Sequence, residues 1–125
     1  MKSMFVTMAL IVIATSVRAQ EPSVAVADIQ AGAVVFRHWC ADCHGPGPLP
    51  GTRVLQRKYQ GAIPAALEER PDIPDALIRL VVRSGMTTMP PFRKTEVTDR
   101  DLALLSAYLT SDMDLRARAN IAPAK

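Results

Sequence analysis

The segment Cys40-Ala41-Asp42-Cys43-His44 holds the only two cysteines of the chain, three residues apart, with a histidine directly after the second. On a helical backbone, residues three and four apart share one face, so both sulfurs and the imidazole can reach the same side. Cys-x-x-Cys-His is the pattern through which haem c is attached. We therefore expect Cys40 and Cys43 to form thioether bonds to one haem and His44 to bind its iron.

Two other sites use a Cys-x-x-Cys pair, a dithiol redox site and half of a zinc site. A zinc site needs two further ligands, and His38 is the only other soft candidate in the sequence. A thioredoxin-like site needs a βαβ context, whereas the apolar periodicity of this chain is helical. A lone Cys-x-x-Cys disulfide would close almost no loop. The haem interpretation accounts for the spacing and the histidine together.

A haem iron bound by one histidine needs a sixth ligand, and the candidates are Met86, Met89, Met113 and His38. Met89 lies 45 residues after His44 and directly before two prolines, which fix the backbone and exclude helix. Met86 follows a glycine typical of a helix end, where an apolar residue usually packs back on the helix. His38 lies too close to the first cysteine to reach the opposite haem face. Met89 is the predicted sixth ligand.

The loop after His44, residues 45–51, contains three prolines and three glycines and is expected to be neither helix nor strand. Such a loop leaves carbonyl groups without partners in the chain. One of them is expected to accept the free N–H of His44, which fixes the tautomer and strengthens the ligand. The Pro48 carbonyl is the first candidate, and those of Pro46 and Pro50 remain open.

Residues 1–19 have the features of a signal peptide: Lys2, an apolar run over residues 4–14, and small or medium residues at positions 17 and 19. The run is too short to span a bilayer, although a retained N-terminal anchor is the alternative. Cleavage would give a periplasmic protein without a membrane anchor. It would carry 13 basic and 12 acidic residues, a balance that gives no reason to expect a nucleic-acid partner.

The rest of the chain predicts an all-α fold in which three main helices wrap around one covalently attached haem. We expect a loose arm over residues 20–27, a domain over 28–114 and a flexible tail over 115–125, whose arginines are solvated. The first main helix starts near Ile29 with Asp28 as its N-cap. The second has Pro74 in its first turn and ends just before Gly85. Its expected apolar stripe is Leu77, Ile78, Val81 and Val82, with Asp75, Arg79 and Arg83 on the other side. Two short helices are expected around residues 53–59 and 64–69.

The last main helix has the strongest signals. Thr98 is the expected N-cap, and Asp101 is a shorter relative of the glutamate in a capping box. An apolar face follows at helical spacing. This helix is expected to cross the first one, with Leu105 or Tyr108 against Gly32 and the core residue Phe36.

These motifs resemble the class I cytochrome c family over nearly all of the chain after residue 19. The resemblance is carried by the following residues: Gly32, Phe36, Cys40, Cys43, His44, Gly85, Met89, Pro90, Phe92, Thr98, Asp101, Leu102, Tyr108 and Leu109. Residues 74–111 are more particularly similar to the cytochrome subunits of flavocytochromes that oxidise para-alkylphenols, of the p-cresol methylhydroxylase and eugenol hydroxylase type. Residues 52–71 depart from the p-cresol pattern.

The resemblance implies that His44 and Met89 are axial ligands and that the chain is a non-catalytic electron-transfer protein. Its donor would be an FAD-containing dehydrogenase or hydroxylase subunit, and its acceptor a small copper protein or another cytochrome. The alternative is a freely diffusing carrier between respiratory complexes. An apolar docking rim would indicate the first role and a ring of lysines the second. A haem peroxidase would need an open iron site, which the Met89 loop should close.

Overall fold

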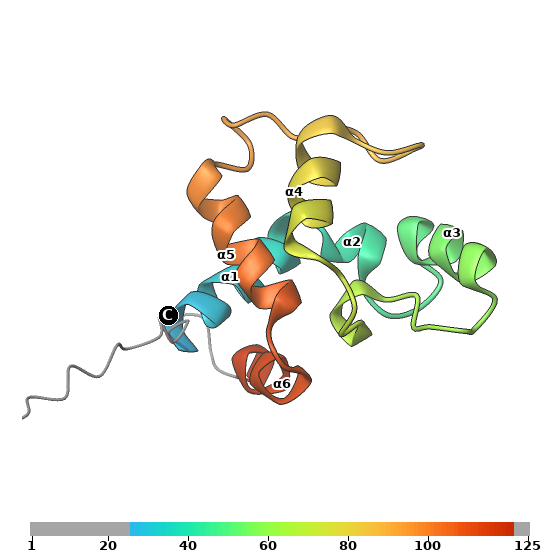
Figure 1. Ribbon diagram of the computed structural model, residues 1–125, viewed down its shortest axis with the longest axis horizontal. Coiled ribbons are helices and arrows are strands. Elements are labelled where there is room, and N and C mark those ends of the chain that lie inside the picture. Colours follow the sequence, from blue (N-terminus) through green and yellow to red (C-terminus); the bar gives the residue numbers. More distant parts are fainter. Residues whose placement is uncertain (1–25, 122–125) are drawn as a thin grey trace, which may run out of the picture.

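The computed structural model of the chain describes residues 26–121, and within them all regular structure is helical. The predicted signal peptide and most of the predicted arm lie outside these residues. The helices are listed here in chain order: α1 (Val26–Trp39), α2 (Ala41–His44), α3 (Pro50–Tyr59), η1 (Leu67–Glu69, a 3₁₀ turn), α4 (Asp75–Ser84), α5 (Asp99–Thr110) and α6 (Met113–Ile121). Figure 1 shows α1, α4 and α5 as the frame of the domain, with α2 and α3 to one side and α6 beneath. The predicted all-α fold is confirmed.

Helices α1 and α5 cross at Gly32, where the two backbones touch. A Cβ atom at Gly32 would lie 2.2 Å from the Leu104 carbonyl oxygen and 2.7 Å from the Tyr108 Cβ. No residue larger than glycine fits at that distance. One turn later the rings of Phe36 and Tyr108 pack with their centroids 5.9 Å apart. The predicted crossing is confirmed, with Tyr108 as the residue that meets both Gly32 and Phe36.

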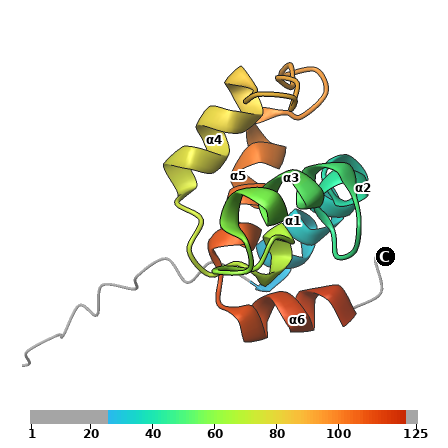
Figure 2. The ribbon, with the colours of Figure 1, turned by 90° about the vertical axis from the view of Figure 1, so that its right-hand side faces the viewer.

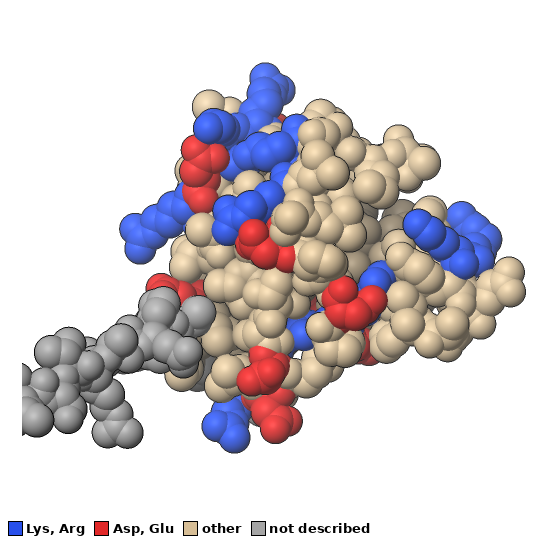
Figure 3. All heavy atoms as spheres, in the orientation of Figure 1, with Lys and Arg blue, Asp and Glu red and all other residues tan. Residues whose placement is uncertain are grey.

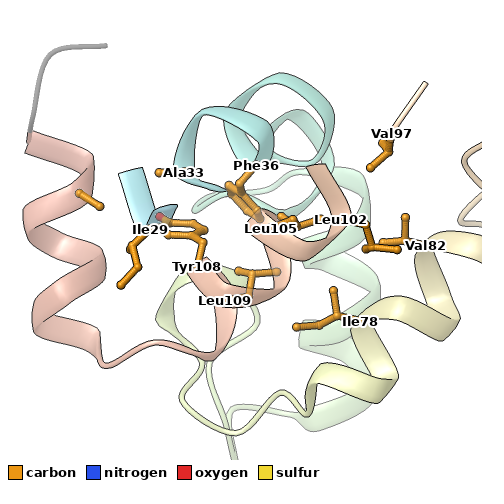
Figure 4. Packing of buried hydrophobic residues seen from close by; sticks show 11 residues of the cluster. Ile29, Ala33, Phe36, Ile78, Val82, Val97, Leu102, Leu105, Tyr108 and Leu109 are labelled. Carbon is orange, nitrogen blue, oxygen red and sulfur yellow. The ribbon is translucent and has the colours of Figure 1, made fainter. Parts of the chain in front are cut away.

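The hydrophobic core lies where α1, α4 and α5 meet (Figure 4). Phe36 and Tyr108 are fully buried at its centre. Ile78 and Val82 join them from α4, and Val97 from the loop before α5. Of the apolar stripe that predicted α4, Ile78 and Val82 face the core, whereas Leu77 is exposed.

The start of α5 has the predicted capping box. The Asp101 N–H donates to the Thr98 hydroxyl at 3.1 Å, and the Thr98 N–H donates to the Asp101 carboxylate at 3.1 Å. Val97 and Leu102 are both buried in the positions of a hydrophobic staple. These local contacts fix the direction in which the chain enters α5.

Three predicted boundaries differ from the structure. Helix α1 already contains Val26, so Asp28 lies in its first turn, where a carboxylate favours the helix dipole, and is not the N-cap. Helix α3 begins at Pro50, inside the loop predicted to be irregular, because proline is well accommodated in a first helical turn. The second short helix, predicted over residues 64–69, is only the 3₁₀ turn at its end.

The predicted flexible tail is wrong over most of its length. Residues 113–121 form α6, which packs against α1 (Figure 2). Arg116 and Ala119 on this helix are each 2% exposed. The arginine was predicted to be solvated, but its guanidinium group donates to the backbone carbonyls of Ser111, Glu68 and Arg70. These three acceptors come from other parts of the chain, which is why the burial cannot be read from the tail alone.

Candidate functional site

The Cys-x-x-Cys-His segment continues the helical path of α1 into α2. The Cys40 N–H donates to the Phe36 carbonyl at 2.8 Å, and the His44 N–H donates to the Cys40 carbonyl at 2.8 Å. Cys40 and His44 are therefore one helical turn apart, as the sequence predicted. Cys40 is partly buried against the core, whereas Cys43 is exposed. The segment is attached to the core through Phe36, the buried residue whose carbonyl accepts the Cys40 N–H.

His44 is held by close packing and not by the predicted hydrogen bond. Its Nδ1 atom is buried and has no hydrogen-bond partner among the described residues, so the predicted bond to the Pro48 carbonyl is absent from this structure. Gly51, at the start of α3, packs against this edge of the ring. Burial lowers the pKa of His44, which favours the neutral imidazole, the form that binds metals. The ring is thus already in the form that an iron ligand needs.

Thr52 closes the proline-rich loop, a role that the sequence did not indicate. Its side chain is 4% exposed, and its hydroxyl lies 2.7 Å from the Gly45 carbonyl and 3.3 Å from the Cys43 carbonyl. The two carbonyl oxygens at the end of α2 would otherwise lack hydrogen-bond donors. The bond ties the first turn of α3 to the end of α2. A threonine in a helical first turn is common, so nothing in the sequence singled it out.

Met89 lies in a tight turn after α4. The Met86 N–H donates to the Met89 carbonyl at 3.0 Å, and the Met89 N–H donates to the Met86 carbonyl at 2.9 Å. Gly85 precedes the turn with a φ of 71°, and Met89 packs against the core beside Phe92. This turn projects on the side of the molecule where α2 and α3 lie (Figures 1 and 2). The predicted sixth ligand is therefore on a hydrogen-bonded turn, on the same side of the molecule as α2.

The other candidate ligands are placed differently. The His38 ring packs edge-on against Trp39 at 4.7 Å between centroids, at the end of α1 and two residues before Cys40. Met113 begins α6, which lies at the opposite end of the molecule from the Met89 turn in both ribbon views. Met86 shares the turn with Met89. The structure thus brings together only the two neighbouring methionines as candidates for the sixth position.

Arg83 fastens the Met89 turn to the rest of the domain. Its guanidinium group donates to the carbonyls of Phe92 at 3.2 Å and Val97 at 2.9 Å, and it pairs with Asp99 at 3.0 Å. The Phe92 N–H also donates to the Val82 carbonyl at 2.8 Å. Both ends of the turn are consequently bound to α4. The sequence pattern had indicated only that Arg83 faces away from the apolar stripe.

The surface is indented between α3 and the turn that follows α4 (Figure 3). A separate hollow of about 540 Å³ lies between the proline-rich loop, α3 and residues 61–69; Pro48, Thr52, Gln56, Ile63 and Glu69 are among the residues that line it. None of the four predicted haem-binding residues lines this hollow. The cofactor site is therefore assigned from the set of donor atoms and not from that hollow.

The donor set fits haem c better than the two rival sites. Burial, with smaller effects from Cys43 and Glu68, raises the pKa of the Cys40 thiol to about 12. A raised pKa makes the Cys40 thiol a poor nucleophile, because the reactive cysteine of a dithiol site has a lowered pKa. Within residues 26–121, no group of three His, Cys, Asp or Glu side chains is placed to hold a metal ion. A histidine directly after two cysteines three residues apart, with a methionine in a hydrogen-bonded turn, supplies the anchors and axial ligands that haem c uses.

An all-α domain with this motif and this methionine turn is a class I c-type cytochrome. The chain belongs to the family described as "Cytochrome C oxidase, cbb3-type, subunit III", whose model matches residues 27–109. The family implies haem c and a role in electron transfer, which confirms the broad part of the resemblance but not the flavocytochrome type. No curated protein and no solved structure matches the chain. Among the described residues, no helix is long and apolar enough to cross a membrane.

Proposed function

We propose that the protein is a periplasmic cytochrome that relays single electrons through one covalently attached haem c. Cys40 and Cys43 provide the thioether bonds, and His44 and Met89 the axial ligands. The observation that carries the proposal is the helical turn that joins Cys40 to His44, closed by the bond from the His44 N–H to the Cys40 carbonyl, with the His44 Nδ1 atom buried. When bound, the haem iron supplies a one-electron couple.

The residues of the chain set the conditions for that couple. Gly51 packs against the His44 ring and limits its rotation. Arg83 and Gly85 hold the Met89 turn, so its thioether is presented from a stiff backbone. A methionine ligand raises the reduction potential relative to a second nitrogen ligand, which suits a carrier that accepts electrons from an organic donor. A rigid pair of ligands also changes little between the two oxidation states.

The donor that we propose is an FAD-containing subunit that oxidises a para-alkylphenol, and the acceptor is a small copper protein or another cytochrome. The resemblance of residues 74–111 to such cytochrome subunits supports this donor. Exposed apolar side chains support it as well: Leu77 is 41%, Leu80 58% and Met86 49% exposed. Exposed apolar side chains of this kind are what a docking rim for a dedicated partner would use.

A freely diffusing carrier remains the second candidate, because α3 has a basic surface. Its charged residues are Arg53, Arg57 and Lys58, and it contains no acidic residue. Figure 3 shows basic side chains gathered over this helix, beside the indented surface. An acidic partner could approach there. Salt-dependent electron transfer would favour this candidate, since attraction between exposed charges is screened by salt.

The test of the haem assignment is the mass of the exported protein. The parent is expected to carry the added mass of one haem, and the Cys40→Ala/Cys43→Ala variant none. A parent with a bare polypeptide mass and two free thiols would overturn the assignment.

The test of the donor is mild purification from the host, followed by addition of a para-alkylphenol. A co-purified flavoprotein that then reduces the cytochrome supports the dedicated subunit, and Leu80→Glu should weaken this association. Reduction only by a respiratory complex supports the diffusing carrier.

A further inference from the structure

The turn that carries Met89 presents a second methionine in a matched position. Met86 and Met89 exchange both of their backbone hydrogen bonds, at 3.0 and 2.9 Å. In such a hydrogen-bonded antiparallel pair, the two side chains leave the backbone on the same face, about 5.5 Å apart at the Cα atoms. Two thioethers therefore start from one face of one turn.

This turn has little freedom to rearrange. Thr87, at its tip, has a φ of 51°, which is rare for a β-branched residue and is maintained only where the surroundings impose it. Gly85 has a φ of 71° on one side, and Pro90 and Pro91 stiffen the other. The relation between the two methionines is consequently fixed by the backbone.

The two side chains are used differently. Met89 is partly buried and packs against the core cluster. Met86 is 49% exposed, although an apolar residue after a helix-ending glycine usually packs back on its helix. Its thioether is therefore not committed to packing. Methionine also has three rotatable side-chain bonds, so the Met86 sulfur can sample many positions around the turn.

We propose that Met86 is a reserve ligand for the haem iron. When the Met89 sulfur is absent from the iron, the Met86 thioether binds in its place and keeps the iron six-coordinate. This inference rests on the proposed haem site and deepens it. The consequence is that small molecules such as carbon monoxide or oxygen have little access to the iron even after Met89 is lost.

The experiment compares four purified haem-loaded proteins: the parent, Met86→Leu, Met89→Ala and Met86→Leu/Met89→Ala. Two properties are measured, the thioether-to-iron charge-transfer absorption of the ferric form and the rate of carbon monoxide binding to the ferrous form. Met86→Leu should match the parent in both. Met89→Ala should retain the charge-transfer absorption. It should also bind carbon monoxide about tenfold more slowly than the double variant, if Met86 occupies nine-tenths of the sites.

The outcomes separate the reserve ligand from the site itself. If Met89→Ala and the double variant lose the absorption and bind carbon monoxide equally fast, Met86 is not a ligand and the inference fails. If Met86→Leu loses the charge-transfer absorption and Met89→Ala keeps it, Met86 is the native ligand. That result also overturns the inference. If the double variant excludes carbon monoxide as well as the parent does, the sixth ligand lies outside this turn and the proposed site fails. Should Met89→Ala fail to acquire haem during maturation, Met89→Leu keeps the packed volume and gives the same comparison by absorption.

Discussion

Gly51 lies against the Nδ1–Cε1 edge of the His44 ring. A Cβ atom at Gly51 would stand 2.6 Å from Cε1 and 2.8 Å from Nδ1, and also 2.8 Å from the Cys43 carbonyl oxygen. Because Nδ1 has no hydrogen-bond partner, this contact is what limits the position of the ring on that side. The first turn of α3 thus positions His44, the proposed iron ligand, because Gly51 has no side chain.

Gly51→Ala should therefore displace His44. A methyl group that needs a shift of nearly 1 Å in its neighbours typically lowers the free energy of unfolding by about 1–3 kcal/mol. Urea unfolding of the haem-loaded protein measures this loss, and the ferric absorption spectrum reports the histidine–iron bond. Both should change together.

Gly47→Ala is the companion variant, because no atom lies within 4 Å of a Cβ there. Its φ of 100° is unfavourable for alanine, with a cost of about 1–2 kcal/mol. Stability should fall while the spectrum stays that of the parent. A Gly51→Ala protein with parental stability and spectrum would show that the ring is not positioned by this contact.

Gly85→Ala should disturb the sixth ligand in a similar way. Its Cβ would lie 2.6 Å from the Met89 carbonyl oxygen and 3.0 Å from the Pro91 nitrogen, at a φ of 71°. Both atoms belong to the stiff backbone of the turn, so the turn itself must move. We expect a loss of about 2 kcal/mol or more in unfolding free energy and a weaker thioether–iron absorption.

Gly61→Ala separates the cost of the positive φ from the cost of the steric clash, since Gly61 has a φ of 84° but open space around its Cβ position. This variant should lose only the conformational part, about 1–2 kcal/mol, and keep the absorption intact. Equal spectra for the two variants would mean that Gly85 does not hold Met89 in place.

The parts of the fold that the sequence predicted well depend on short-range signals. The Thr98–Asp101 capping box needs only a three-residue spacing, and α4 is bounded by Pro74 and Gly85. The contact between Gly32 and Tyr108 is long-range, but it could be predicted because Gly32 shares a helix face with Phe36 and a glycine there allows close approach. The cysteine motif likewise acts within one helical turn.

The parts of the fold that the sequence did not predict depend on contacts between segments that are distant in the chain. Arg116 is buried because carbonyls from residues 68, 70 and 111 happen to surround it, and an arginine in a terminal segment is otherwise solvated. The Thr52 bond and the unpartnered His44 Nδ1 depend on the path of a proline-rich loop. Loop geometry of this kind carries no period in the sequence.

Arg116→Met tests whether α6 is an integral part of the domain. The change keeps an apolar stem but removes the donors that satisfy three backbone carbonyls. Buried acceptors left without donors cost about 1–3 kcal/mol, so the urea midpoint should fall while the m-value stays constant. Arg118→Met, on the exposed face of the same helix, should stay within about 0.5 kcal/mol of the parent. Equal urea midpoints for the two variants would mean that α6 does not stabilise the domain and that the segment behaves as the predicted flexible tail.

Tyr108→Phe isolates the polar contact that joins α5 to residues 67–69 and α6. The Tyr108 hydroxyl donates to the Glu68 carboxylate at 2.5 Å and accepts from the Asn120 amide at 2.7 Å, while its ring packs on Phe36. Phenylalanine keeps the ring contact and removes only the hydroxyl. At neutral pH we expect a loss of about 1–3 kcal/mol, because Glu68 keeps only its longer bond to Asn120 at 3.3 Å.

The pH dependence of this variant gives a second and independent measure. Burial, followed by the bond to and charge of Glu68, raises the pKa of Tyr108 above its ordinary value of 10.0. The unfolded chain therefore releases the phenolic proton at a lower pH than the folded protein does. The stabilisation is complete below pH 10 and is lost as the pH rises above it. Urea unfolding from pH 8 to pH 11 should then show a difference between the parent and Tyr108→Phe that shrinks above about pH 10. A constant difference across that range would mean that the tyrosine is not buried against the Glu68 carboxylate.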